Sequence, residues 1–280
     1  MPAGRRLDRL GATEPRALVF ACPVEPLGLE FRPPFDAQRL LGFLAPRALP
    51  GIEEVDGVAY RRPRDGVEVR VEGHSVTMVR GVPGAVDRAR SLLDLDADPG
   101  LIGSALRGDP LLAGLVARRP GVRVPGAFDG FEVAVRAVLG QQVSVAAATT
   151  LAGRLIRAFG GFPSAPALAE SGLEGVGLTR ARASGLRALA RAVADGAVRL
   201  EPGADVAALL ELPGIGPWTA AYIAMRALRD PDAIPLSDLG LRRALARFGA
   251  DARPAAVAAR AERWRPYRAY AAMQLWVSGE

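Results

Sequence analysis

The chain has 280 residues, half of them hydrophobic, and a net charge of +6. This length suits one large or two ordinary domains, and the basic balance favours an anionic partner. One cysteine, Cys22, excludes an internal disulfide and a cysteine-ligated zinc or iron–sulfur centre, and one histidine, His74, argues against a histidine-based metal site.

The kind of basic residue matters more than the charge itself. All 36 basic side chains are arginine, because the sequence contains no lysine. No side-chain amine is therefore present to form a Schiff base. The sequence opens without a signal-like segment and contains no apolar run of membrane-spanning length, so we expect a soluble, cytoplasmic protein without a membrane partner.

The first 24 residues are predicted to form a loose tail, and residues 25–98 a small α+β domain. Its apolar runs predict an antiparallel sheet packed against two helices, with hairpin turns at Asp65-Gly66 and Gly73-His74. Arg61-Arg62-Pro63-Arg64 is interpreted as a solvated strand end. The strands are expected at 27–31, 51–62, 67–72 and 75–80, and the helices at 36–45, capped by Asp36, and 84–93.

The Asp-rich stretch 94–100 predicts a domain boundary. Beyond it, Ala-rich segments with apolar residues at helical spacing alternate with Gly and Pro breaks, which predicts an all-helical domain over residues 99–280. The helices are expected at 109–118, 128–139, 143–159, 180–195, 206–212, 217–228, 239–248, 254–264 and 268–276.

The helical part is organised around residues 212–241. Its opening, Leu212-Pro213-Gly214-Ile215-Gly216, is a tight glycine turn that leads into a helix, where free backbone N–H groups favour an anion. Trp218 and Tyr222 lie four residues apart on one helical face, either as core residues or as two walls of a slot for a flat ligand. Asp238 begins the next helix, either as an N-cap alone or as a carboxylate with a chemical role.

These residues, LPGIGPWTAAY followed by IPLSDLGL, resemble the helix-hairpin-helix–Gly/Pro/Asp (HhH-GPD) superfamily of base-excision DNA glycosylases. Within it they are similar to the AlkA-type 3-methyladenine DNA glycosylase II branch. Residues 128–153 and 261–276 resemble further segments of that branch, and residues 29–57 resemble the start of its N-terminal α+β domain. The resemblance extends from about residue 26 to the end of the sequence.

The resemblance implies a glycosylase that flips alkylated bases, of the 3-methyladenine and 7-methylguanine class, out of duplex DNA and hydrolyses their N-glycosidic bond. Asp238 matches the catalytic carboxylate. Trp218, Tyr222, Trp276 and Phe43 match positions of the base pocket, where aromatic faces attract cationic bases.

The resemblance also implies how DNA is held. The family often carries a monovalent cation at the hairpin backbone, so Na⁺ or K⁺ is expected at Leu212–Gly216, with no metal held by side chains and no required cofactor. Two positions depart from the family pattern: Gln142 stands where an apolar wedge is frequent, and Ser237 stands where a second acidic residue is frequent. The DNA-contacting residues are expected to be Gly214, Ile215, Gly216, Thr219, Gln141 and Gln142.

Related glycosylases that also cut the strand carry a lysine within the hairpin segment. In this lysine-free chain Trp218 follows the turn, so we expect a monofunctional enzyme without AP-lyase activity. Its expected partner is damaged duplex DNA, bound by a monomer at the nucleoid. Two alternatives stay open: a glycosylase for another lesion, such as a deaminated base, and a non-catalytic DNA-binding module in which Asp238 is only a cap.

Overall fold

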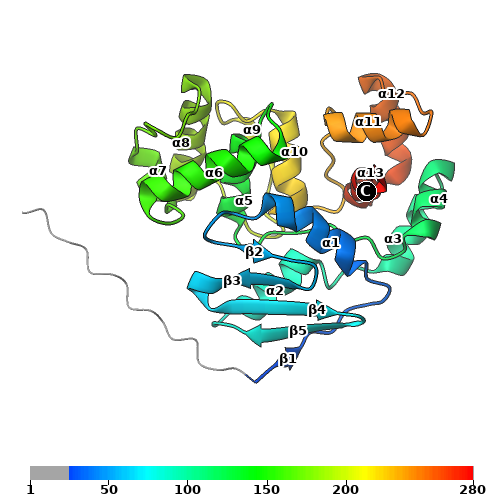
Figure 1. The fold of residues 1–280 in the computed structure, drawn as a ribbon. Helices are drawn as coiled ribbons and strands as arrows, with labels where there is room; N and C mark the ends of the chain where they lie inside the picture. The colour runs from blue at the N-terminus through cyan, green and yellow to red at the C-terminus, as the bar shows by residue number, and fades with distance from the viewer. Residues whose placement is uncertain (1–24, 280) are drawn as a thin grey trace, which may run out of the picture.

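The computed structural model describes residues 25–279, so the predicted tail over residues 1–24, with Cys22, lies outside the described residues. A small antiparallel sheet is followed by a region built from helices, which confirms the predicted fold class (Figure 1). The strands are β1 (Leu27–Gly28), β2 (Glu54–Val55), β3 (Ala59–Arg62), β4 (Val67–Glu72) and β5 (Ser75–Arg80), in the sheet order β1-β5-β4-β3-β2.

The central strands follow their side-chain alternation. Val67, Val69 and Val71 are buried on one face of β4, and the hairpin to β5 turns at Gly73, whose φ of 57° favours glycine. β4 and β5 have the predicted bounds. The strand expected over 51–62 is interrupted, because Asp56 accepts backbone hydrogen bonds from Val58 and Ala59 and turns the chain between β2 and β3.

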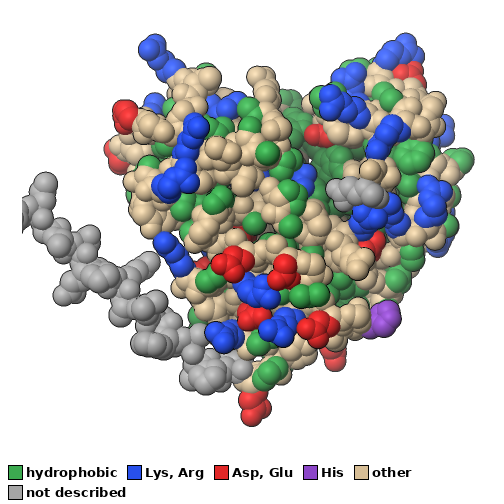
Figure 2. Space-filling model, viewed as in Figure 1, with side chains coloured by type: hydrophobic (Ala, Val, Ile, Leu, Met, Phe, Trp, Pro, Cys, Tyr) green, Lys and Arg blue, Asp and Glu red, His purple; other side chains and the backbone are tan. Residues whose placement is uncertain are grey.

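Two helices pack against the sheet. In α1 (Ala37–Leu44) the predicted cap Asp36 accepts a hydrogen bond from the Arg39 backbone N–H, and buried leucines face the sheet together with apolar residues of α2 (Ala85–Leu93). The sheet's outer face carries charged side chains of both signs (Figure 2). The small domain therefore has one buried and one solvated sheet face.

The remaining helices begin close to their predicted positions, but two were not predicted. The first begins inside the expected boundary stretch, where Asp98 caps it; the second has only six residues. No helix within residues 25–279 is long and apolar enough to cross a membrane. The helices are α3 (Pro99–Leu106), α4 (Pro110–Arg118), α5 (Gly130–Leu139), α6 (Val145–Phe159), α7 (Ala165–Glu170), α8 (Arg180–Ala194), α9 (Ala207–Leu210), α10 (Pro217–Arg226), α11 (Leu239–Arg247), α12 (Pro254–Ala261) and α13 (Arg268–Trp276).

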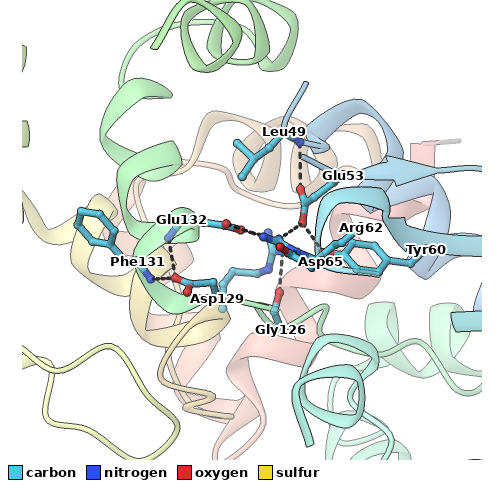
Figure 3. Close-up of polar contacts among 10 residues, drawn as sticks. Leu49, Glu53, Tyr60, Arg62, Asp65, Gly126, Asp129, Phe131 and Glu132 are labelled. Carbon is cyan, nitrogen blue, oxygen red and sulfur yellow. Dashed lines mark hydrogen bonds and ion pairs between the residues drawn. The ribbon is translucent and has the colours of Figure 1, made fainter. Parts of the chain in front are cut away.

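A buried ion pair joins the sheet to α5 (Figure 3). Arg62, at the end of β3, donates two hydrogen bonds of 2.7 Å to the Glu132 carboxylate, and its guanidinium also lies 3.7 Å from Glu53. Arg62 is only 5% exposed. The interpretation of this arginine as a solvated strand end is therefore wrong, because three carboxylates, including that of Asp65, compensate its charge inside the protein.

Candidate active site

The glycine turn of residues 212–216 connects α9 to α10 and packs closely against α8. Gly214 has a φ of 81°, and a Cβ at this position would lie 3.3 Å from the Cα of Gly185 in α8. Both the backbone conformation and the close approach therefore require glycine. The turn is fixed on one side by another helix, which leaves its other side exposed.

The exposed side of the turn presents unpaired backbone donors. Within the described chain, no acceptor is found for the N–H groups of Gly214, Gly216, Trp218 and Thr219. Ile215 differs, because its N–H donates to the Leu212 carbonyl at 3.1 Å and its side chain is buried. The turn and the start of α10 thus offer free N–H donors of the kind that suit an anion, and the buried Ile215 anchors the turn in the core.

The loop between α5 and α6 is tied to this turn. The Gln141 side chain donates to the Gly214 carbonyl at 2.7 Å and to the Thr219 hydroxyl at 3.0 Å, and Thr219 is buried. Gln141 and Thr219 therefore bind each other across the turn. The neighbouring Gln142 is exposed and holds a φ of 56°, which is uncommon for a residue other than glycine.

Asp238 caps α11 and receives three hydrogen bonds. Its Oδ1 accepts from the Leu241 backbone N–H at 2.8 Å and from Trp276 Nε1 at 2.9 Å, and its Oδ2 accepts from Trp218 Nε1 at 3.0 Å. The carboxylate is half-buried and forms no ion pair with any residue of the described range. It is an oriented carboxylate that forms no ion pair among the described residues.

The aromatic residues form a continuous chain of ring contacts, in which two stacked pairs are joined by a tilted pair. Trp218 and Tyr222 lie 5.4 Å apart at an interplanar angle of 10°, Tyr222 and Trp276 lie 6.4 Å apart, and Trp276 stacks on Phe43 at 6.0 Å. Contacting rings leave no room for a base between Trp218 and Tyr222, so the predicted slot between these two side chains is wrong. Phe43 is only 4% exposed and supports Trp276 from behind.

A cavity of about 440 Å³ contains Asp238 and the four aromatic residues in its wall. A larger groove of about 840 Å³ shares Trp218 and Asp238 with it and continues to Gln142 and the glycine turn. Figure 2 shows the molecule hollowed between the helices α5–α10 and α11–α13, with hydrophobic side chains inside the hollow. Asp238 lies where cavity and groove meet.

Arginines line the cavity or contact its aromatic wall, and the sequence reasoning missed them. Arg47 and Arg136 contribute to the wall, and Arg226 donates to the Tyr222 hydroxyl at 2.8 Å. Burial lowers the pKa of Arg136, and the nearby cations Arg47 and Arg226 lower it further. Burial alone would raise the pKa of the Tyr222 phenol, but the three guanidinium groups outweigh it and lower this pKa.

One signal could have found these arginines. Arg136 is the only basic residue of the apolar helix α5 and follows the buried Glu132 by four residues. Arg226 stands at the end of α10, which is otherwise free of charged residues. A lone arginine in an apolar helix must find acceptors or a cavity, because burying its charge without compensation is costly. At the mouth, exposed Arg243 on α11 lines both cavity and groove.

Comparison with known proteins matches two families in succession. Residues 26–129 match the AlkA N-terminal domain, and residues 135–269 match the HhH-GPD superfamily base excision DNA repair protein family. The chain is 33% identical to DNA-3-methyladenine glycosylase 2 of Escherichia coli, over 89% of this chain and 95% of that protein.

Two further similarities extend the comparison. The chain is 42% identical, over 91% of its residues, to the probable bifunctional transcriptional activator/DNA repair enzyme AlkA of Mycobacterium tuberculosis, and it spans 57% of the length of that relative. The solved 3-methyladenine DNA-glycosylase from Archaeoglobus fulgidus superposes with a TM-score of 0.74 over 90% of this chain and 97% of that one. At 23% identity, this likeness shows a shared fold.

Proposed function

The chain belongs to the AlkA branch of the HhH-GPD superfamily of base excision DNA repair proteins, and we propose that it hydrolyses the N-glycosidic bond of alkylated bases in duplex DNA. Asp238 carries this proposal. It is an oriented carboxylate without an ion-pair partner in residues 25–279, at the junction of an aromatic cavity and a groove with free backbone donors. A DNA-binding module would need the groove but not this cavity.

The groove supplies the DNA contacts of the proposed reaction. The free N–H groups of Gly214, Gly216 and Thr219 bind a backbone phosphate, which carries no sequence information and suits an enzyme that searches all sequences. Exposed Gln142 enters the space left by the flipped nucleotide and offers its amide to the orphaned base. The flipped base enters the cavity beside Trp218 and Trp276.

Asp238 is the catalytic residue of the proposed reaction. As the bond from the base to the sugar C1′ breaks, positive charge develops on the sugar, and the neighbouring carboxylate stabilises it. The departing base takes the bonding electrons, and a water molecule adds to C1′ and loses its proton. Because a base alkylated at N3 or N7 is already cationic, it leaves without prior protonation.

The hairpin carbonyls fit a monovalent cation. The Gly214 carbonyl accepts one hydrogen bond from Gln141, and the Leu212 carbonyl accepts one from Ile215. Each oxygen therefore retains a lone pair for a hard cation. We include Na⁺ or K⁺ bound by these carbonyls in the proposal, where its charge would add to the attraction for a phosphate.

The reaction ends with an intact abasic site. A lyase of this superfamily forms an imine between a lysine and the sugar, and this chain has no lysine. We therefore expect base release without strand cleavage, and no covalent enzyme–DNA adduct on borohydride treatment. An adduct trapped in good yield would contradict this part of the proposal.

One observation favours a second substrate class. Within the described residues, Arg136 Nη1 in the cavity wall is buried and has no hydrogen-bond acceptor, and such a donor suits the carbonyl oxygen of a neutral, deaminated base. Release of 3-methyladenine, 7-methylguanine, hypoxanthine and uracil from otherwise identical duplexes separates the two classes. We expect the alkylated bases to be released faster; release of none of the four would overturn the proposed function.

A further inference from the structure

We propose that Trp218 and Trp276 are positioning residues that hold the Asp238 carboxylate through the edges of their indole rings. This inference rests on the proposed function and assigns these side chains a role separate from contact with the base. Each indole N–H donates to a different carboxylate oxygen, at 3.0 Å for Trp218 and 2.9 Å for Trp276. Two donors from two helices fix the plane of the carboxylate.

The hydrogen-bond count assigns different roles to the two oxygens. A carboxylate oxygen has two lone pairs in its plane. Oδ1 of Asp238 already accepts from Trp276 and from the Leu241 backbone, whereas Oδ2 accepts only from Trp218. Oδ2 therefore keeps one position open, and it is the oxygen that faces the sugar or orients water. Trp218 directs this oxygen, and Trp276 secures the other.

Trp218 is itself held by a chain of contacts. Its ring stacks on Tyr222, whose hydroxyl accepts a hydrogen bond from Arg226 at 2.8 Å. The buried Arg226 guanidinium also donates to the carbonyls of Pro125 and Gly126, in the segment before α5. Trp218, and with it Asp238 Oδ2, is therefore held in place through Tyr222 by the buried Arg226.

Trp276 is held from the small domain. Its ring stacks on Phe43 of α1 at 6.0 Å and 19°, and the guanidinium of Arg47 lies 3.7 Å from the centre of the Phe43 ring. Stacking and cation–π contacts of this kind restrict ring rotation. The N-terminal α+β region therefore supports one of the two donors to Asp238.

Gly240 leaves room for this arrangement. A Cβ at Gly240 would lie 3.0 Å from Asp238 Oδ1 and 3.5 Å from Trp276 Nε1. Glycine within a helix is unfavourable relative to alanine, so its use in the first turn of α11 needs a local reason. The space beside the carboxylate and the indole is that reason.

The two donors are neutral, and this matters for catalysis. Arg47, Arg136 and Arg243 line the same cavity, but none forms an ion pair with Asp238. A cation bound to the carboxylate would fix it equally well but would compete with the positive charge of the transition state. Indole N–H groups orient the carboxylate and leave its negative charge available.

The geometry can be tested without any activity. The chain contains three tryptophans, so a ¹⁵N spectrum of the full chain contains three indole N–H resonances. Asp238→Asn is expected to shift those of Trp218 and Trp276 and to leave that of Trp264, whose N–H donates to Asp109, in place. Asp109→Asn is the matched control and should shift only the Trp264 resonance. Unchanged Trp218 and Trp276 resonances in Asp238→Asn would overturn the inference.

Kinetics test the positioning role. Trp218→Phe keeps an aromatic ring but removes the donor, so single-turnover release of 7-methylguanine and of hypoxanthine should fall by the same factor, about tenfold or more, with unchanged affinity for a duplex carrying a tetrahydrofuran abasic site. Trp276→Phe should cost less, because Oδ1 keeps the Leu241 donor. A loss confined to the cationic base would show a stacking role alone and overturn the inference.

Gly240→Ala provides the sharpest kinetic variant. Alanine favours the helix. If Gly240 has only a structural role, Gly240→Ala should therefore leave the thermal stability unchanged or raised and the base-release rate unchanged. The positioning role predicts a fall in the release rate of both bases, by about tenfold, without loss of thermal stability. A normal rate in this variant would contradict the role given to Gly240. Wild-type protein that releases neither base would overturn the proposed function, whereas the indole spectrum would still decide the geometry.

Discussion

Two aspartates in this molecule begin helices and accept a hydrogen bond from an indole, but their electrostatic surroundings differ. Asp109 caps α4 and accepts from Trp264 Nε1 at 2.9 Å, and Arg260 donates two further hydrogen bonds of 2.7 and 2.6 Å to its carboxylate. Asp109 is 1% exposed. Asp238 accepts from two indoles, is half-buried and faces a cavity.

The difference separates a structural carboxylate from a reactive one. Burial alone would raise the pKa of the Asp109 carboxyl, but the hydrogen bonds from Arg260 and Trp264 lower it below its usual range. The negative charge of Asp109 is thereby compensated inside the protein by Arg260. Asp238 is oriented by three hydrogen bonds and forms no ion pair among the described residues, so its charge remains available to a positive centre. An Asp at the start of a helix can therefore be structural or reactive, and the groups that surround its carboxylate decide which role it has.

Removing the charge of Asp109 should produce the largest change in stability. Asp109→Asn keeps a good N-cap but breaks the pair with Arg260, which should cost about 3 kcal/mol of unfolding free energy at pH 7. Because the pKa of Asp109 is lowered in the folded state, its contribution is complete above the unfolded pKa and is lost as the pH falls through the folded pKa.

Chemical denaturation of wild type and Asp109→Asn across acid pH measures this difference. The stability gap should close as the pH falls below the ordinary carboxyl range, and the release rate per folded molecule should stay normal throughout. A gap that is constant with pH would show that the carboxylate charge of Asp109 does not contribute to folding.

Removing the indole donor at the structural site should have a smaller effect. Trp264→Phe leaves Arg260 on Asp109 and costs one hydrogen bond to a charged group, about 2 kcal/mol, together with some packing. Differential scanning calorimetry should show a lower melting temperature, and base release should be unaffected. If Trp264→Phe slowed release as much as Trp218→Phe does, the contrast between the two clusters would fail.

Much of the fold could be predicted from local patterns. The alternation of Val67, Val69 and Val71 fixes a strand that is buried on one face, and apolar residues at helical spacing locate α10 and α13. Such patterns depend on neighbours within a few residues, which the sequence displays directly. The glycine turn and Asp238 were found in the same way, together with the family resemblance that gave them meaning.

The contacts that decide the site connect residues far apart in the sequence. Arg62 and Glu132 are separated by 70 residues, and Arg226 reaches a carbonyl 100 residues away. No spacing rule predicts such pairs, so the sequence alone indicates a solvated Arg62 and assigns no role to Arg226. The direction of a ring is also hidden in the sequence. The family resemblance implies that Trp218 and Trp276 line the pocket, but only the structure shows that their N–H edges turn to Asp238.

Base release by Asp238→Asn tests the central claim most directly. Asparagine preserves the cap of α11 and the shape of the side chain but removes the negative charge. We expect release of 7-methylguanine from a duplex to fall by at least about 100-fold, while affinity for a duplex with a tetrahydrofuran abasic site and thermal stability change little. A variant that releases the base at the wild-type rate would contradict the assignment of Asp238 as the catalytic carboxylate.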